Sequence, residues 1–193
     1  SPVSMMDEMS IPTVYLEALV LKCAQILKNK GRHVPNLVTA GGFIEESSIF
    51  KAIALSNFGK GPLVKAVLMG RAPVTAVMKS SYFKRLSQEA KLPKTFADRY
   101  GATPDRFFIT TPELKEKYGK RFRDIPLEAI GLYAYLTDRI GVGLKQLMAG
   151  ARKWKLELLD RNDLMSLSER AAKVTGIPMA DEVEKDAIEK ILE

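Results

Sequence analysis

The chain has 193 residues, of which 46% are apolar and 27% charged, a composition typical of a globular protein with a hydrophobic core. One cysteine, Cys23, and one histidine, His33, exclude an internal disulfide, a multi-cysteine zinc or iron–sulfur site, and any Ser–His–Asp triad without His33. No apolar run is long enough to span a bilayer, and the polar, acidic beginning does not resemble a signal peptide. We therefore expect a cytoplasmic protein without a membrane partner.

The formal net charge of +7 raises the question of nucleic-acid binding. Lysines and arginines are interleaved with acids, as in "DRNDLMSLSER", and form no long block of like charge. A basic surface around an anionic cofactor or partner accounts for the charge equally well. Nucleic acid is therefore the least favoured partner, and salt-dependent binding would be its signature.

The first half of the chain alternates helical and strand patterns. Residues 13–31 have the spacing of a helix that ends at Gly31, with apolar residues at Leu16, Leu19, Val20, Cys23, Ile26 and Leu27. "NLVTA" (36–40) predicts a strand, which Gly41-Gly42 ends. A second helix follows over 45–57, with a buried stripe at Ile49, Phe50, Ile53 and Ala54. "LVKAVLM" (63–69) predicts a second strand, and Gly70-Arg71 opens a third helix.

This alternation is typical of a parallel α/β sheet, and the apolar strands predict cover on both faces. Such a sheet needs more than two strands, and the sequence shows no others. From Tyr82 onward prolines and glycines are frequent, with helical patterns near 112–118 and over 127–154. N-caps are expected at Asp160, Ser168 and Asp181. We therefore divide the chain into βα units at 1–81 and a mostly helical extension at 82–193.

The two glycine turns raise a functional question. At the carboxyl ends of parallel strands, glycines let backbone N–H groups approach an anion, and the following helix adds its partial positive charge. Gly41, Gly42, Gly70 and Arg71 would then form one phosphate site, with Arg71 adding a charge-assisted contact. Ordinary turn chemistry, with Arg71 as a solvated residue at a helix start, is the alternative.

The segment "NLVTAGGFIEESSIFKAIALSN…LVKAVLMGRAP" resembles the end of TIM barrels that bind flavin mononucleotide (FMN), in which Gly-Gly and Gly-Arg turns hold the phosphate. More narrowly, residues 1–35 resemble part of the FMN-binding domain of the glutamate synthase family. The tail "GLYAYLTDRIGVGLKQLMAGARKW" is similar to tails of the short, stand-alone glutamate-synthase-like proteins. The resemblance implies a cofactor-binding role for Gly41, Gly42, Gly70 and Arg71, and the fold of the last βα units of an incomplete (β/α)8 barrel.

The sequence also departs from this family. The cysteine cluster that follows the eighth strand in glutamate synthase is replaced by "GRAPVTAVMKSS", so no iron–sulfur centre is expected. The amidotransferase domain is missing, as are the earlier strands that contact the isoalloxazine ring and 2-oxoglutarate in the family. The loop "SNFGKGPL" is longer than the usual connection before the last strand. The chain therefore resembles a C-terminal fragment.

The resemblance implies a flavoprotein oxidoreductase of amino-acid biosynthesis. Its parent would use FMN for reductive amination of 2-oxoglutarate, or a similar imine or carbonyl reduction, with a glutamate-type substrate. An N-terminal half or a second copy would complete it. The alternative is an inactive α/β fragment that self-associates through its open sheet edge. No catalytic residue and no metal ligand is assigned.

Three further residues invite a functional interpretation. Glu17 lies among apolar neighbours, either as a partly exposed helix acid, which we favour, or as a buried acid near the flavin. Cys23 is expected in the core as a small apolar residue. His33 is expected on the surface, in the loop before the first strand.

Overall fold

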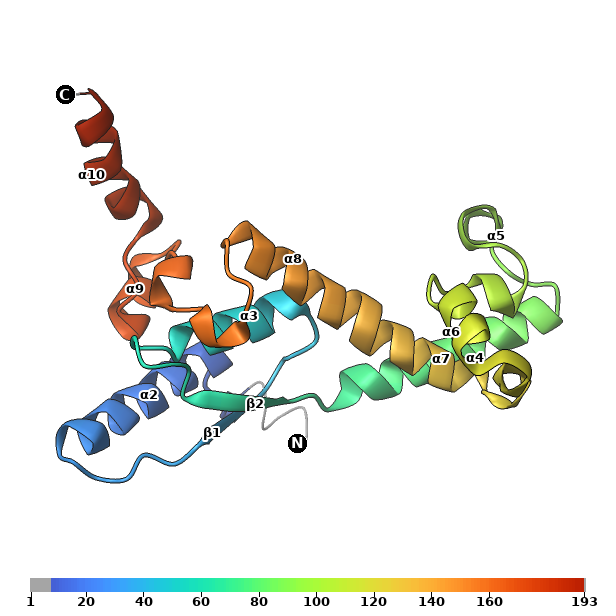
Figure 1. Ribbon diagram of the computed structural model, residues 1–193, viewed down its shortest axis with the longest axis horizontal. Helices are drawn as coiled ribbons and strands as arrows, with labels where there is room; N and C mark the ends of the chain where they lie inside the picture. The colour runs from blue at the N-terminus through green and yellow to red at the C-terminus, as the bar shows by residue number, and fades with distance from the viewer. Residues whose placement is uncertain (1–7, 193) are drawn as a thin grey trace. The chain divides into compact units, whose positions relative to one another are not determined.

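The computed structural model describes residues 8–192, which are mostly helical and contain one two-stranded parallel sheet (Figure 1). The chain forms two compact units. The sheet unit comprises the residues up to Gly42, Ser47–Leu68 and the residues from Leu147 onward, and the helical unit comprises Phe43–Glu46 and Met69–Gln146. The boundary that the sequence predicts after residue 81 falls within a helix, and it stays a prediction.

The sheet unit contains the predicted elements in the predicted order. They are α2 (Thr13–Asn29), β1 (Leu37–Ala40), α3 (Glu46–Leu55) and β2 (Val64–Leu68). The strands are parallel, as expected, and the register sets Ala40 opposite Leu68. The carboxyl ends of both strands therefore lie at one edge of the sheet. The coarse α/β class is confirmed. Two strands do not establish the more specific assignment to a TIM barrel, which stays a prediction.

The core of the sheet unit joins segments that are far apart in the sequence. Leu21 of α2 and Leu55 at the end of α3 pack against Ile177. Between α3 and β2, the buried Ser56 hydroxyl donates to the Ile53 carbonyl at 2.8 Å and accepts the Val64 amide at 3.2 Å. These contacts fix the loop that leads into β2.

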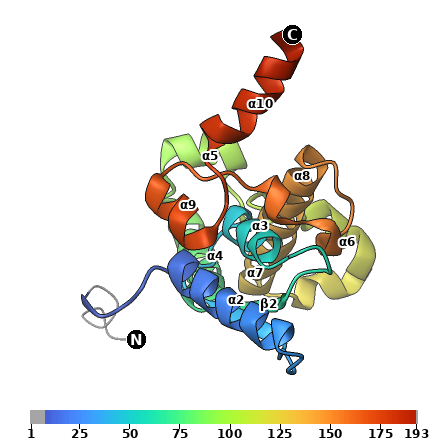
Figure 2. The same ribbon diagram turned by 90° about the vertical axis from the view of Figure 1, so that its left-hand side faces the viewer.

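The C-terminal segment is anchored to this core. The Asn57 amide donates to the Leu159 carbonyl at 2.7 Å, and the Arg161 guanidinium donates to the Leu55 carbonyl at 3.1 Å. Figure 2 shows α9 (Glu169–Thr175) beside α2, with which it packs. The residues from 147 onward thus complete the sheet unit.

The predicted buried faces of this unit are partly wrong. All six apolar residues of the predicted α2 stripe, Cys23 included, are exposed, and Glu17, Ala18, Leu21 and Ala24 are buried instead. Because α2 is apolar on more than one side, periodicity did not identify the side that its neighbours cover. The strands are not covered on both faces either, since Val38 is 55% and Leu68 60% exposed. The predicted stripe of α3 is buried apart from Ile53, which is half-buried.

The helical unit is built on two packed helices, α4 (Arg71–Gln88) and α7 (Leu127–Ala134). Between them in the chain lie α5 (Lys94–Tyr100), η1 (Pro104–Arg106), α6 (Thr111–Tyr118) and η2 (Gly119–Asp124). The predicted helix near 112–118 is confirmed as α6. The close approach of α4 and α7 depends on Gly131, where a Cβ atom would overlap the Ser80 hydroxyl and lie 2.9 Å from the Ser80 Cβ.

The long helical pattern over 127–154 is interrupted. After α7 the chain forms the π-helix η3 (Tyr135–Val142) and then α8 (Gly143–Gly150). π-Helical segments are rare and frequently occur at functional sites. This irregularity was not predicted, because a π-turn shifts the helical phase without a distinct residue signature.

The final residues form short elements, η4 (Leu156–Leu158), η5 (Arg161–Asp163), α9 and α10 (Ala180–Leu192). Asp160 and Ser168 cap η5 and α9, as predicted. Asp181 does not cap α10, because the helix starts one residue earlier and places Asp181 in its first turn. Among residues 8–192, none of the helices has both the length and the apolar character that crossing a bilayer requires.

Candidate functional site

The Gly41-Gly42 turn follows β1 directly. Gly41 has φ +116° and Gly42 has φ +74°, conformations that favour glycine. The Thr13 hydroxyl donates to the Gly41 carbonyl at 2.9 Å. A Cβ on Gly41 would lie only 2.5 Å from Oγ1 of Thr13. A Cβ on Gly42 would meet nothing within 4 Å. The packing of α2 thus requires glycine at position 41. At position 42 the space that a side chain would occupy is open.

The second predicted turn follows β2. Gly70 precedes α4 with φ −85°, and a Cβ there would meet nothing within 4 Å, so the described contacts give no steric reason for glycine. Within residues 8–192, neither the Gly42 amide nor the Gly70 amide donates to a protein acceptor. Arg71 is the first residue of α4, and its carbonyl accepts the Thr75 hydroxyl at 2.9 Å.

The four predicted cofactor-binding residues stand on the chain segments that leave one edge of the sheet. Gly41 and Gly42 belong to the sheet unit, and Gly70 and Arg71 to the helical unit. The site that these residues would form together therefore stays a prediction.

Helix α3 begins with an acidic residue of its own. Glu46 is its first residue and belongs to the helical unit, within which its Oε2 lies 3.4 Å from Nε of Arg139. A carboxylate at this position takes up the positive end of the helix dipole. An anion bound at the Gly41-Gly42 turn would therefore be held by the glycine amides and not by the dipole of α3.

Glu17 is buried, with 8% of its surface exposed, and its Oε1 has no hydrogen-bond partner in the described chain. This burial raises the pKa of Glu17 to about 7. The favoured interpretation of a partly exposed acid was therefore wrong. Thr13 and Glu17 are one turn apart on α2, so the buried acid is on the helix face that carries the contact to Gly41. His33 is exposed, as predicted.

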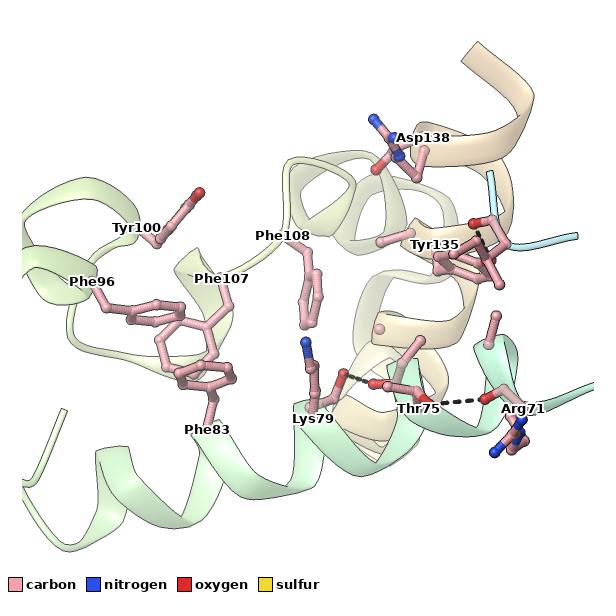
Figure 3. Close-up of a pocket in the computed structure, with 17 residues that line it drawn as sticks. Arg71, Thr75, Lys79, Phe83, Phe96, Tyr100, Phe107, Phe108, Tyr135 and Asp138 are labelled. Atoms are coloured by element: carbon pink, nitrogen blue, oxygen red, sulfur yellow. Dashed lines mark hydrogen bonds between the residues drawn. The ribbon is translucent and has the colours of Figure 1, made fainter. Parts of the chain in front are cut away.

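The helical unit contains a cavity of about 930 Å³ that the sequence did not predict. Its apolar wall is aromatic and comprises Phe83, Phe96, Tyr100, Phe107 and Phe108 (Figure 3). The Phe83 and Phe96 rings stack at 4.3 Å, and Phe107 meets Phe96 edge to face at 5.3 Å. These residues come from separate elements, so no periodic pattern in the sequence brings them together.

The rest of the cavity wall is mixed. It includes aliphatic residues such as Ile44 and Ala134, and it carries three cationic side chains, Arg71, Lys79 and Arg139, and one carboxylate, Asp138. Tyr135 of η3 donates its hydroxyl to the Ile44 carbonyl at 2.8 Å, which holds segment 43–46 at the rim. Burial is the main cause that raises the pKa of Asp138. In Figure 3 the Lys79 amine points toward the Phe108 ring, while Arg71 turns away from the aromatic wall.

Comparison of the chain with protein-family models, with curated protein sequences and with solved structures gives no match. Within residues 8–192, no three His, Cys, Asp or Glu side chains are grouped as a metal site would need.

Proposed function

We propose that the chain carries the phosphate-binding end of an FMN site in an oxidoreductase related to glutamate synthase. The observation that carries this proposal is the pair of parallel strands that end side by side, with Ala40 opposite Leu68. Two residues beyond each strand end stands a glycine, Gly42 or Gly70, whose amide has no acceptor in the described chain. Loops at the carboxyl ends of parallel strands are the usual ligand-binding edge of α/β folds.

The glycines at 42 and 70 support the proposal through what they leave open. Neither has a neighbour within 4 Å that would exclude a Cβ, so both leave the backbone accessible to a ligand. The amides would donate to phosphate oxygens, and Arg71 would add a charge-assisted hydrogen bond. The net charge of +7 favours an anionic ligand of this kind.

FMN, when bound, supplies the transfer of reducing equivalents to an imine or carbonyl group. The substrate class proposed for the parent protein is that of 2-oxoglutarate and glutamate. The role of this chain's residues is to bind and orient the phosphate end of the cofactor. We assign none of them as a catalytic acid or base.

An FMN titration of the full chain, followed by flavin fluorescence, tests the proposal. Gly42→Asp places a carboxylate in the turn. We expect it to weaken FMN binding at least about tenfold, because the carboxylate repels the phosphate and its side chain blocks the phosphate from the backbone amide. Gly59→Asp is the matched control, because Gly59 also has positive φ, +89°, and no neighbour within 4 Å, but lies before β2. Equal weakening of FMN binding by both variants would contradict the phosphate site. So would a wild-type chain that does not bind FMN saturably.

A second candidate function is self-association of the sheet unit. It is favoured by the exposed apolar face of α2, where Leu16, Leu19 and Ile26 are each about half exposed, and by the exposed Val38 on β1. In the described chain both strands are also edge strands, which present unpaired backbone groups.

Sedimentation velocity tests this second candidate. We expect a dimer or larger species at micromolar concentration, which Leu19→Glu converts to monomer by placing a charge in the apolar contact. An exposed position in the helical unit and so outside this surface, Glu116→Lys, serves as the control. A wild-type chain that is monomeric throughout would rule out self-association as its function.

A further inference from the structure

We propose that the cavity of the helical unit is a binding site for a small aromatic carboxylate. Lys79 would pair with the carboxylate, and the aromatic wall of the cavity would contact the ring. This site lies wholly within the helical unit. Arg71 lines the cavity and also belongs to the proposed phosphate site, but the proposal made here rests on Lys79 and the aromatic wall and not on FMN binding.

The size and lining of the cavity fit a small molecule. Its volume of about 930 Å³ falls within the range of roughly 300–1,000 Å³ that ligand pockets occupy. Such pockets combine a mostly apolar wall with a few polar groups that set the orientation of the ligand. Here the wall provides six aromatic rings, with Tyr135 in addition to the five of the aromatic wall, and the polar groups lie along α4 and η3.

Lys79 is the polar group that selects the charge of the ligand. Of the cations that line the cavity, Arg139 pairs with Glu46 and Arg71 has its own interaction, whereas Lys79 has no hydrogen-bond or ion-pair partner in residues 8–192. Lys84, five residues further along α4, is by contrast paired with Glu128 at 3.6 Å. Lys79 thus presents an ammonium group beside aromatic rings without a protein anion to neutralise it (Figure 3).

The remaining charge also favours an anion. Asp138 is the one carboxylate in the wall, and the Thr137 hydroxyl lies 3.5 Å from its Oδ1. A bound carboxylate would be attracted by Lys79, on the α4 side of the cavity. A cation would instead be repelled by the Lys79 ammonium group.

The aromatic wall favours a ring over an aliphatic chain. Phe96 already takes part in a stacked contact with Phe83 and a tilted contact with Tyr100 at 5.0 Å. An added ring extends this cluster with further stacked or edge-to-face contacts, each worth about 0.5–1.5 kcal/mol beyond area burial, which is about a two- to tenfold gain in affinity.

Isothermal titration calorimetry on the full chain tests the site with 2-naphthoate as the probe. Octanoate keeps the carboxylate and replaces the rings by a chain, and 2-naphthol keeps the rings without the carboxylate. We expect saturable binding of 2-naphthoate, with octanoate and 2-naphthol each at least about fivefold weaker.

Variants of Lys79 connect the binding to the cavity. Lys79→Met is expected to weaken 2-naphthoate binding at least about tenfold, and Lys79→Arg to restore it to within about threefold of wild type. Lys120→Met is the matched control, because Lys120 is an exposed lysine of the same unit outside the cavity wall. Lys79 is exposed, so its replacement leaves the folded core intact.

Three results would overturn the proposal. They are a wild-type chain that does not bind 2-naphthoate saturably, a Lys79→Met variant that binds as tightly as wild type, and 2-naphthol binding as tightly as 2-naphthoate. Octanoate binding as tightly as 2-naphthoate would overturn the assignment of an aromatic ligand.

Discussion

Replacing Glu17 by glutamine is expected to raise the free energy of unfolding at pH 8 by about 2 to 3 kcal/mol. The side chain is buried without a hydrogen bond to Oε1, and burial raises its pKa from 4.5 to about 7. At pH 8 the wild-type protein therefore holds an unpaired carboxylate in its core. Glutamine has the same shape and stays neutral at every pH.

The sign of the pH dependence follows from the same shift. Below pH 4.5 Glu17 is protonated in both the folded and the unfolded chain, so its favourable contribution is fully present. Between pH 4.5 and about 7 the unfolded chain loses this proton first, and the stability falls as the pH rises. The glutamine variant should lack this component of the pH dependence.

Urea unfolding followed by circular dichroism at pH 5 and pH 8 measures the effect. The difference between variant and wild type should be larger at pH 8 than at pH 5. Glu157→Gln is the control, because Glu157 is an exposed glutamate of the same sheet unit, and it should change the stability little at either pH. A Glu17→Gln variant with the wild-type pH dependence would show that Glu17 is solvated or paired.

Replacing Gly131 by alanine is expected to destabilise the helical unit by at least about 2 kcal/mol, although alanine is the better helix former. The added Cβ would overlap the Ser80 hydroxyl and lie 3.1 Å from the Phe108 ring. Ser80 is buried, so its side chain has little space to move away from α7. The helices α4 and α7 would have to separate, which would also change the cavity wall at Phe108.

A double-mutant cycle with Ser80→Gly isolates this contact. Ser80→Gly removes the overlapping atoms, so the double variant should be more stable than the sum of the two single effects by at least about 1 kcal/mol. Gly150→Ala is the matched helical control, because a Cβ at Gly150 would meet nothing within 4 Å. Thermal unfolding provides the measurement, and additive effects in the cycle would contradict the close packing of α4 and α7.

The order of the elements could be predicted because it depends on local patterns. The strands at 36–40 and 63–69 and the helices between them are marked by apolar runs that glycine turns end, and these signals do not need tertiary context. The prediction of the buried face failed for α2, because its apolar residues extend around the helix and the face that is buried includes Glu17. Which face is covered depends on neighbours such as α9, more than 140 residues further along the chain.

The two candidate sites differ in the same way. The turns at Gly41-Gly42 and Gly70-Arg71 are contiguous motifs, so the sequence placed them, and the structure adds that Gly41 is required by Thr13. The aromatic cavity draws Phe83, Phe96 and Phe107 from α4, α5 and the residue after η1, which tertiary packing alone brings together. Lys79 has no local signal that separates it from the paired Lys84.

The affinity of the full chain for FMN relative to riboflavin tests the proposed phosphate site most directly. The two flavins differ only in the phosphate, and titrations at equal ionic strength compare them without any substitution. Charge-assisted contacts from the glycine amides and Arg71 should give a preference for FMN of about 10- to 100-fold. Equal affinity for both flavins, or no saturable binding of either, would contradict a phosphate site at the ends of β1 and β2.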